Sequence, residues 1–394
     1  MAFGFRSSDV EHTLVVLLQR LGPLSRAELA REAGFSRSTV STTINGMIDR
    51  GLVVEGAHIR TEVRGRPAQL VSLAPSAGTA VGIDFGFRHV RGAIADLSHK
   101  VLGTAEVELD IDYSPDAGIE AAAAIVEDIV EQAGLSRTNL LGIGVGIPCP
   151  TDLSGTTTRS AMIPTWSGIR IQERLAARFA LPVHVENESR LAAWGEVVWG
   201  AARGVRNFVY LKLHSGVGGA VFVNGQCVSG CRGGAGEIGH VSLDTRGPIC
   251  RCGNRGCLEV YAGIPAVLQQ LTQVHPGINL PKLLSLYRVE DPSVCRVISE
   301  VAQKVGQAAG MLCNTLNPEL LLIGGSFSAL GEPFLAQVRP ALDNVSIDLN
   351  RGTRVEIGTL GRNASVMGAV ARAFQLFGNS SLGRSTQPTP AFAR

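Results

Sequence analysis

The sequence predicts a small helical module followed by a larger α/β domain of two lobes. Residues 1–73 hold three helical segments separated by proline and glycine. From residue 81 onward, glycine-rich and β-branched runs alternate with alanine- and leucine-rich stretches, as in layered α/β folds. Residues 81–95 and 208–223 each read as a strand, a glycine turn and a returning strand, so the two lobes echo each other.

The composition is that of an ordinary globular protein. The chain has 394 residues, enough for two or three domains, with 45% hydrophobic and 18% charged residues. A net charge of +2 means that affinity for nucleic acid has to come from a local patch. We see no signal peptide and no stretch of about 20 apolar residues, so no membrane partner is expected. The 8 cysteines suit a reducing cytoplasm better than a disulfide framework.

The amino-terminal segment predicts a helix-turn-helix. Residues 9–20 place leucine and valine on one helix face. Ser25, with Glu28 three residues later, forms a capping box for a helix over residues 26–33, which Gly34 ends. Ser36 caps a third helix, over residues 37–50. In this layout the helix after the turn enters a DNA major groove.

The third helix carries short polar side chains that suit phosphates and base edges. We predict that DNA is contacted by Ser36, Arg37, Ser38, Thr39, Ser41, Thr42 and Asn45. Strands over residues 52–55 and 69–73 would form a wing, from which Arg64 and Arg66 reach a phosphate or a minor groove. A three-helix module that binds another protein is the alternative.

The predicted domain boundaries follow changes in composition. Residues 1–73 form the winged helix-turn-helix, and residues 74–80, which are small, polar and proline-containing, form a linker. Residues 81–377 form the α/β domain. Residues 378–394 are polar, and we expect them to be a disordered tail.

Residues 236–259 contain a pattern of metal ligands. His240 precedes Cys250, Cys252 and Cys257, and one imidazole with three thiolates makes a closed tetrahedral zinc shell. Such a site is structural, because no coordination position stays open for water. A chance cluster, a redox thiol pair and a disulfide are the alternatives.

This segment also resembles, residue for residue, the signature of the ROK family, named for repressors, open reading frames and sugar kinases. The resemblance covers about residues 9–377 and implies an actin/hexokinase-like, ribonuclease H-like fold. It implies a zinc-anchored loop that presents Glu237, His240 and Glu259 to sugar hydroxyls. The two glutamates could instead hold the zinc ligands.

Two motifs depart from the ROK kinases. Asn187 matches the asparagine that grips the sugar, but Glu188 stands where the kinases carry the aspartate base, and xylose-repressor-like ROK regulators resemble this chain there. Both Asn187 and Glu188 are predicted to contact the sugar, together with the three residues of the zinc-anchored loop. In the first phosphate turn, Asp84 and Gly86 match, whereas Phe87 and Arg88 replace the glycine and threonine that cradle phosphate. The remaining nucleotide positions are better kept, and they are Ser215, Gly216, Gly218, Gly324 and Gly325.

We therefore expect a sugar-responsive, DNA-binding transcriptional regulator of the ROK family, and specifically a repressor. Its expected partners are a sugar, a structural Zn²⁺ ion and a double-stranded operator with an inverted repeat, bound by a homodimer or tetramer. ATP and Mg²⁺ are not expected. The alternatives are an ATP-dependent sugar kinase with an attached DNA-binding domain, in which Glu188 would be the base, and a zinc-stabilised interaction protein without a small ligand.

Overall fold

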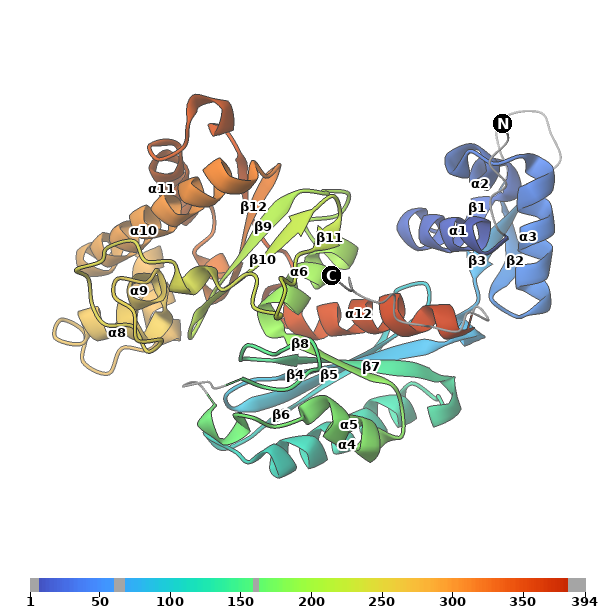
Figure 1. Cartoon of the computed structure of the whole chain (residues 1–394), viewed down its shortest axis with the longest axis horizontal. Coiled ribbons are helices and arrows are strands. Elements are labelled where there is room, and N and C mark those ends of the chain that lie inside the picture. Colours follow the sequence, from blue (N-terminus) through green and yellow to red (C-terminus); the bar gives the residue numbers. More distant parts are fainter. Residues whose placement is uncertain (1–6, 60–67, 159–162, 382–394) are drawn as a thin grey trace.

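The computed structural model describes residues 7–59, 68–158 and 163–381 and consists of a small amino-terminal module and two lobes (Figure 1). The amino-terminal module has three helices and a three-stranded antiparallel sheet of order β1-β3-β2. Its elements are α1 (Ser7–Leu21), β1 (Leu24–Ser25), α2 (Arg26–Ala33), α3 (Arg37–Asp49), β2 (Val53–Ile59) and β3 (Ala68–Leu73).

Local signals set the ends of the two helices of the turn. Ser25 and Glu28 form the predicted capping box at α2, and Gly34 ends this helix in the left-handed region at φ 70°. The Ser36 side chain accepts a hydrogen bond from the Thr39 amide and caps α3. The predicted helix-turn-helix is therefore confirmed, and its fully buried residues include Leu14, Leu29 and Ile44.

The first lobe is built on a five-stranded sheet of order β6-β5-β4-β7-β8. Helices α4 and α5 cover one face, and α12 lies against the other (Figure 1). Its strands are β4 (Thr79–Phe85), β5 (His89–Asp96), β6 (Val101–Glu108), β7 (Leu140–Ile147) and β8 (Val183–Asn187), and its helices are α4 (Pro115–Gln132), α5 (Ile171–Phe179), α6 (Glu188–Trp199) and α12 (Ala364–Ser381).

The second lobe repeats this plan with a sheet of order β11-β10-β9-β12-β13. Its strands are β9 (Phe208–Leu213), β10 (Val217–Val223), β11 (Gln226–Cys227), β12 (Leu320–Gly325) and β13 (Arg354–Ile357), and its helices are α7 (Glu259–Ala262), α8 (Ile264–Leu271), α9 (Leu280–Arg288), α10 (Pro292–Leu316) and α11 (Glu332–Asp343). Short 3₁₀ helices lie at Pro75–Ala77, Arg137–Asn139, Pro164–Trp166, Ile238–His240, Ser326–Leu330, Asp348–Asn350 and Gly361–Asn363.

The predicted duplication is confirmed by the strand pairing. In each lobe an antiparallel hairpin, β4 with β5 or β9 with β10, is followed by a strand parallel to its first member, β7 or β12. Helix α6 packs against both α12 and the second sheet, so the two helices lie between the sheets. The cleft between the lobes therefore opens where α6 begins, next to Asn187 and Glu188.

Two predicted boundaries differ from the structure. Strand β4 begins at Thr79, and Ala74, Thr79 and Ala80 are buried, so the predicted linker is packed chain whose last two residues pair with β5. Helix α12 continues through Ser381, so residues 378–381 are helical, and the rest of the predicted tail lies outside the described residues. Arg64 and Arg66 of the predicted wing tip also lie outside them.

Candidate functional site

The four predicted zinc ligands lie together in the second lobe. His240 ends the 3₁₀ helix Ile238–His240, and the three cysteines follow in the loop that leads to α7. One donor atom from each residue lies within 4.8 Å of all the others. The Cys252 Sγ–Cys257 Sγ distance is 3.7 Å and the Cys250 Sγ–His240 Nδ1 distance is 3.6 Å. Thiolates bound to Zn²⁺ at about 2.3 Å would be separated by about 3.8 Å, so the cluster has the size of a tetrahedral zinc site.

A tight loop backbone holds this cluster. Gly256 has a φ of 62°, and a Cβ atom there would overlap the Asp244 carbonyl group. The Leu243 amide donates to the Gly256 carbonyl, and the Leu258 amide donates to the Val241 carbonyl. The chain therefore doubles back on itself and brings Cys257 to His240 without help from a regular helix or strand.

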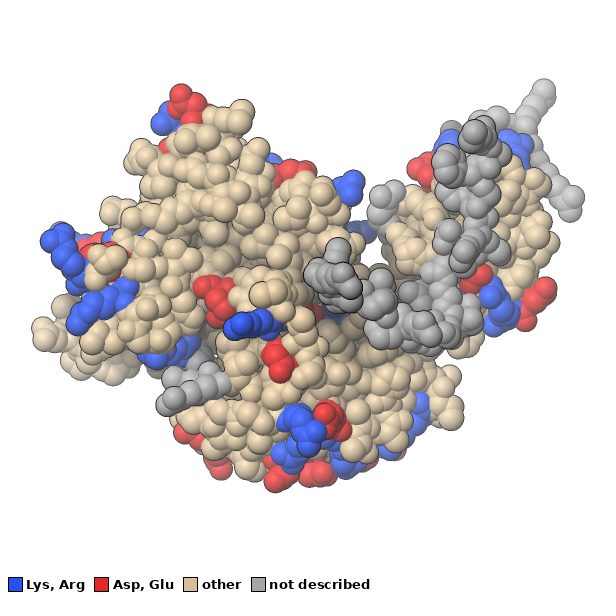
Figure 2. Space-filling view, in the orientation of Figure 1, with Lys and Arg blue, Asp and Glu red and all other residues tan. Residues whose placement is uncertain are grey.

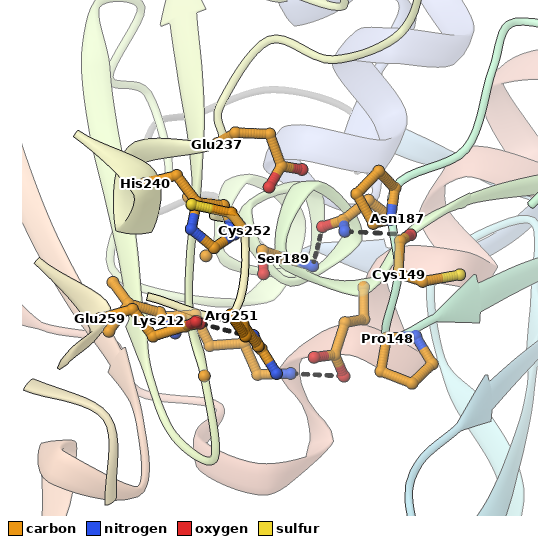
Figure 3. Close-up of a pocket in the computed structure, with 16 residues that line it drawn as sticks. Pro148, Cys149, Asn187, Ser189, Lys212, Glu237, His240, Arg251, Cys252 and Glu259 are labelled. Atoms are coloured by element: carbon orange, nitrogen blue, oxygen red, sulfur yellow. Dashed lines mark hydrogen bonds and ion pairs between the residues drawn. The ribbon is translucent and has the colours of Figure 1, made fainter. Parts of the chain in front are cut away.

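The five predicted sugar residues line one cavity of about 160 Å³ between the lobes (Figure 3). Asn187 and Glu188 come from the junction of β8 and α6 in the first lobe. In the second lobe, Glu237 and His240 lie at the 3₁₀ helix Ile238–His240, and Glu259 begins α7. Figure 3 shows Asn187 and Cys149 on one side of the cavity and His240 and Glu259 on the other. The five residues are Asn187, Glu188, Glu237, His240 and Glu259, and we call the cavity that they line the sugar cavity after this prediction.

Glu237 is the carboxylate with the most freedom to bind a ligand. Its side chain is half-buried, and within the described part of the chain it makes no hydrogen bond or ion pair. Burial raises the pKa of Glu237 above its usual value, although the nearby His240 opposes this shift. A carboxylate that has lost water and gained no partner gains most from hydroxyl donors of a ligand.

Asn187 and Glu259 are partly committed to the protein. The Asn187 Oδ1 atom accepts a hydrogen bond from the Ser189 amide, and its Nδ2 group donates to the Cys149 carbonyl. The Glu259 Oε2 atom accepts from the Val217 amide at 3.0 Å and from Arg251 at 2.6 Å. Glu259 therefore ties the loop of the predicted zinc ligands to the first residue of β10, which is close to the alternative role that the sequence left open for it.

Lys212 is a functional candidate that the sequence did not single out. Its Nζ atom lies 2.7 Å from Glu188 Oε2, and the two side chains are only 14% and 20% exposed. Both residues line the sugar cavity and also a second cavity of about 400 Å³. The Glu188–Lys212 ion pair therefore stands where the two cavities meet.

The second cavity brings together most of the positions that the sequence predicted for nucleotide binding. It is lined by Asp84, Gly86, Ser215, Gly216 and Gly325, whereas Gly218 lines the sugar cavity and Gly324 packs against Tyr210. Asp84 is not free, because Ser365 Oγ donates to its carboxylate at 2.6 Å and the His89 and Arg91 side chains lie within 3.7 Å. Phe87 also lines this cavity, where the kinases have glycine.

Most of the predicted DNA-contacting residues of α3 are exposed together on one side of the winged helix. Ser36, Arg37, Ser38, Thr39, Thr42 and Asn45 are exposed and Ser41 is half-buried, whereas Val40, Ile44 and Met47 pack inward. The Asn45 Oδ1 atom accepts a hydrogen bond from Arg26, which also pairs with Glu55. Basic and acidic side chains are interspersed over the face of the molecule that Figure 2 shows.

Trp166 is buried in the first-lobe core against Phe85 and Tyr113. Within residues 7–59, 68–158 and 163–381, no helix is both long and apolar enough to cross a bilayer.

Comparison with known proteins assigns both parts of the chain. The ROK family matches residues 80–375, and the MarR family matches residues 8–60. The xylose repressor of Bacillus spizizenii is 28% identical over 349 residues, which cover 88% of this chain and 90% of that protein. The glucokinase of Halalkalibacterium halodurans is 27% identical over 308 residues, which cover 73% of this chain and 92% of that protein.

A solved structure extends the likeness to the whole fold. A ROK family transcriptional regulator, described as a homologue of the E. coli MLC protein, superposes with a TM-score of 0.80 at 22% identity. The match covers 96% of this chain and 98% of that one. The chain therefore belongs to the ROK family and carries a winged helix of the MarR type in front of its ROK domain.

Proposed function

We propose that this protein is a transcriptional repressor that binds an operator through its winged helix and responds to a sugar bound between its lobes. The observation that carries the proposal is the sugar cavity, which is lined by residues of both lobes in a chain that begins with a winged helix. A sugar that contacts Asn187 on one lobe and Glu237 and His240 on the other favours a closed arrangement of the lobes. Its effect on DNA follows if the closed form binds the operator differently from the open form.

An aldopentose is the first sugar to test, since the similar Bacillus protein is named a xylose repressor. An operator is selected from random DNA duplexes, and its mobility shift is measured with D-xylose, D-glucose and N-acetylglucosamine. We expect at least one sugar to weaken operator binding by about 5- to 150-fold. Operator binding that ignores every sugar would refute the sensing half of the proposal, and a failure to select any operator would refute the other half.

We also propose that His240, Cys250, Cys252 and Cys257 hold one structural zinc ion. The ion would pin the loop that carries Glu237, because all four ligands lie within or next to that loop. Elemental analysis should find one zinc per chain in the native protein and none in Cys257→Ser. The matched control is Cys231→Ser, which removes an exposed cysteine outside the cluster and should leave both zinc and sugar affinity unchanged. A native protein without zinc would contradict this proposal.

A homodimer on an inverted repeat is the assembly that we propose, because winged-helix repressors read paired half-sites. Light scattering of the free and operator-bound protein would measure the number of chains per complex. Two chains per operator are expected, or four if the protein is a tetramer. A single chain on the selected operator would exclude this assembly.

A sugar kinase with an attached DNA-binding domain is the second candidate function. It is favoured by the 400 Å³ cavity, which is lined by Asp84, Ser215 and Gly216, and by the similarity to a glucokinase. It is opposed by Phe87 in the phosphate turn and by Lys212, which neutralises the residue at the base position. A coupled assay of ADP release over a panel of monosaccharides separates the two functions, and we expect no release above background.

A further inference from the structure

Arg190 is a buried arginine that joins the two lobes beside the sugar cavity. It lies in the first turn of α6, and the whole residue is only 5% exposed. Its Nη1 group donates a hydrogen bond to the Gly233 carbonyl, which belongs to the second-lobe loop between β11 and the 3₁₀ helix Ile238–His240. We call residues 228–236 of this loop the bridging loop. Arg190 is not among the residues that line the sugar cavity, so any effect on a sugar has to act through other residues.

The other side of the Arg190 guanidinium is anchored in the first lobe. Its Nε atom lies 3.0 Å from Glu186 Oε1, and both side chains are buried. Glu186 belongs to β8, whose backbone pairs with β7 in the first sheet. The Glu186 carboxylate also lies 3.2 Å from Arg372 Nε of α12 and 3.3 Å from His184 Nε2. Burial alone would raise the pKa of Glu186, but these three neighbours lower it to about 2, so the anchor is a charged carboxylate.

The bridging loop approaches the first lobe closely at Gly233. This glycine has a φ of 84°, and a Cβ atom there would lie 2.6 Å from the Thr151 carbonyl oxygen. Thr151 is buried in the first lobe, where it is bridged to Thr157. A side chain at Gly233 would therefore displace either the bridging loop or the first lobe. The contact with Arg190 and the contact with Thr151 thus hold the same point of the loop.

The bridging loop leads directly to Glu237 in the sugar cavity. Gly236 has a φ of 95°, and a Cβ atom there would lie 2.5 Å from the Gly219 carbonyl oxygen of β10, so the chain just before Glu237 lies close against the second sheet. Asn187 lies on the other lobe, three residues before Arg190. A change in the separation of the lobes therefore changes the separation of Asn187 and Glu237, which a bound sugar has to bridge.

We propose that Arg190 is a positioning residue for the sugar cavity, which holds the two lobes at the separation that a sugar bridges by tying the Gly233 carbonyl to Glu186. A hydrogen bond from a charged donor favours the joined arrangement by about 10- to 150-fold over one in which it is broken. A protein that spends less time in the joined arrangement binds its sugar more weakly. This role rests on the proposed sugar function, whereas the contact between the bridging loop and the first lobe does not.

Two substitutions break this contact from opposite sides. Arg190→Met removes the charge and the donors but keeps a long side chain, and Glu186 retains its two other partners, so the variant should fold. Gly233→Ala leaves the buried charges intact and displaces the bridging loop from Thr151. Isothermal titration measures the affinity for whichever of D-xylose, D-glucose and N-acetylglucosamine acts in the mobility-shift assay.

Each substitution should weaken sugar binding by about tenfold or more. The double variant should bind no more weakly than the weaker single variant, because both changes remove the same contact. The control is Arg178→Met, which removes an arginine paired with Glu120 inside the first lobe and should keep native affinity. Native sugar affinity in Arg190→Met, or a loss in the double variant that equals the product of the two single losses, would overturn the proposal.

Arg190→Lys separates positioning from stability. Lysine keeps a positive charge beside Glu186, but its single ammonium group does not replace both Nε, which faces Glu186, and Nη1, which binds the Gly233 carbonyl. The free energy of unfolding in urea should therefore be closer to the native value than in Arg190→Met, while sugar binding stays weakened. Sugar affinity that simply follows the free energy of unfolding across these variants would mean that Arg190 only stabilises the fold, and the proposal would be wrong.

Hydrogen exchange tests the contact without any sugar. The Ala235 amide donates to the Ser229 carbonyl inside the bridging loop, so its exchange reports on opening of this loop. In the sugar-free protein, Arg190→Met should speed exchange in the bridging loop by at least about fivefold and leave β12 at its native rate. Unchanged exchange in the loop, or an equal increase in β12, would overturn the proposal. If no sugar binds the native protein while Arg190→Met still opens the loop, the proposed sugar function alone fails and the contact is upheld.

Discussion

Glu237 and Glu188 are two carboxylates in one cavity with opposite surroundings. Glu188 is paired with Lys212 at 2.7 Å, so a ligand that takes its oxygen atoms has to compensate for the loss of an ion pair. Glu237 has no ion-pair partner among the described residues, and burial raises its pKa. We therefore expect a bound sugar to gain more from Glu237 than from Glu188, although Glu188 is the residue that occupies the position of the kinase base.

Replacement of Glu237 tests this difference. Glu237→Gln keeps the size of the side chain but turns one acceptor oxygen into a donor and removes the charge. Sugar affinity should fall by about tenfold or more, because a hydrogen bond to a charged group is stronger than a neutral one. Isothermal titration measures the affinity, and the zinc content of the variant should stay at the native value. Native sugar affinity in Glu237→Gln would remove this residue from the binding site.

His99 predicts how stability depends on pH. Its folded pKa of about 4 arises mainly from burial; Asp96 opposes this effect and Arg203 adds to it. Since the pKa is about 6.5 in the unfolded chain, the unfolded state binds more protons between pH 6.5 and 4. The contribution of His99 to stability is therefore complete above pH 6.5 and is lost as the pH falls towards 4.

The matched variant is His99→Asn. Asparagine does not titrate in this range, and it tolerates the left-handed backbone that His99 has at φ 68°. Urea unfolding at pH 7 and pH 5 measures the free energy of unfolding of each protein. On acidification the native protein should lose about 2 kcal/mol more than His99→Asn. An equal loss in the two proteins would show that His99 is already protonated, or already exposed, in the folded state.

At the scale of elements, signals that act within a few residues were predictive, and pairings across the fold were not. Ser25 and Ser36 cap their helices as predicted, because a capping hydrogen bond spans only three residues. The cysteine spacing likewise predicted the cluster around His240. Lys212 was missed, because its meeting with Glu188 depends on how β9 lies beside the start of α6. The buried ion pair of Glu186 with Arg372, which comes from α12, was missed for the same reason.

The third helix gives the element-scale prediction. Arg37 lies exposed in the first turn of α3, on the surface that is expected to face DNA. Arg37→Ala should weaken operator binding and reduce the slope of log affinity against log salt by about 1, as expected for one lost phosphate contact. Fluorescence anisotropy at several salt concentrations measures both. The control is Arg31→Ala on α2, which removes an exposed arginine paired with Glu32 and should leave the slope unchanged.

At the scale of the whole molecule, helices α6 and α12 connect the sugar cavity with the winged helix. Helix α12 packs on the first sheet and on α6, and its buried residues share one apolar cluster with α1 and α3 of the winged helix. Asn187, which lines the sugar cavity, is the N-cap residue of helix α6. We therefore expect any movement of the lobes to be transmitted to the winged helix through these packed helices.

This coupling has a consequence that is independent of its structural route. If sugar weakens operator binding by a given factor, operator DNA has to weaken sugar binding by the same factor, since both pathways lead to the same ternary complex. We expect a common factor of about 5- to 150-fold. Isothermal titration of sugar into the free protein and into the operator complex gives one value, and operator titration with and without saturating sugar gives the other.

Glu237→Gln should keep operator affinity but lose the response at sugar concentrations that saturate the native protein, whereas Arg37→Ala should keep sugar affinity. Unequal factors would mean that the sugar also changes the number of chains on the operator, because reciprocity between two ligands holds only when the assembly is the same in both measurements.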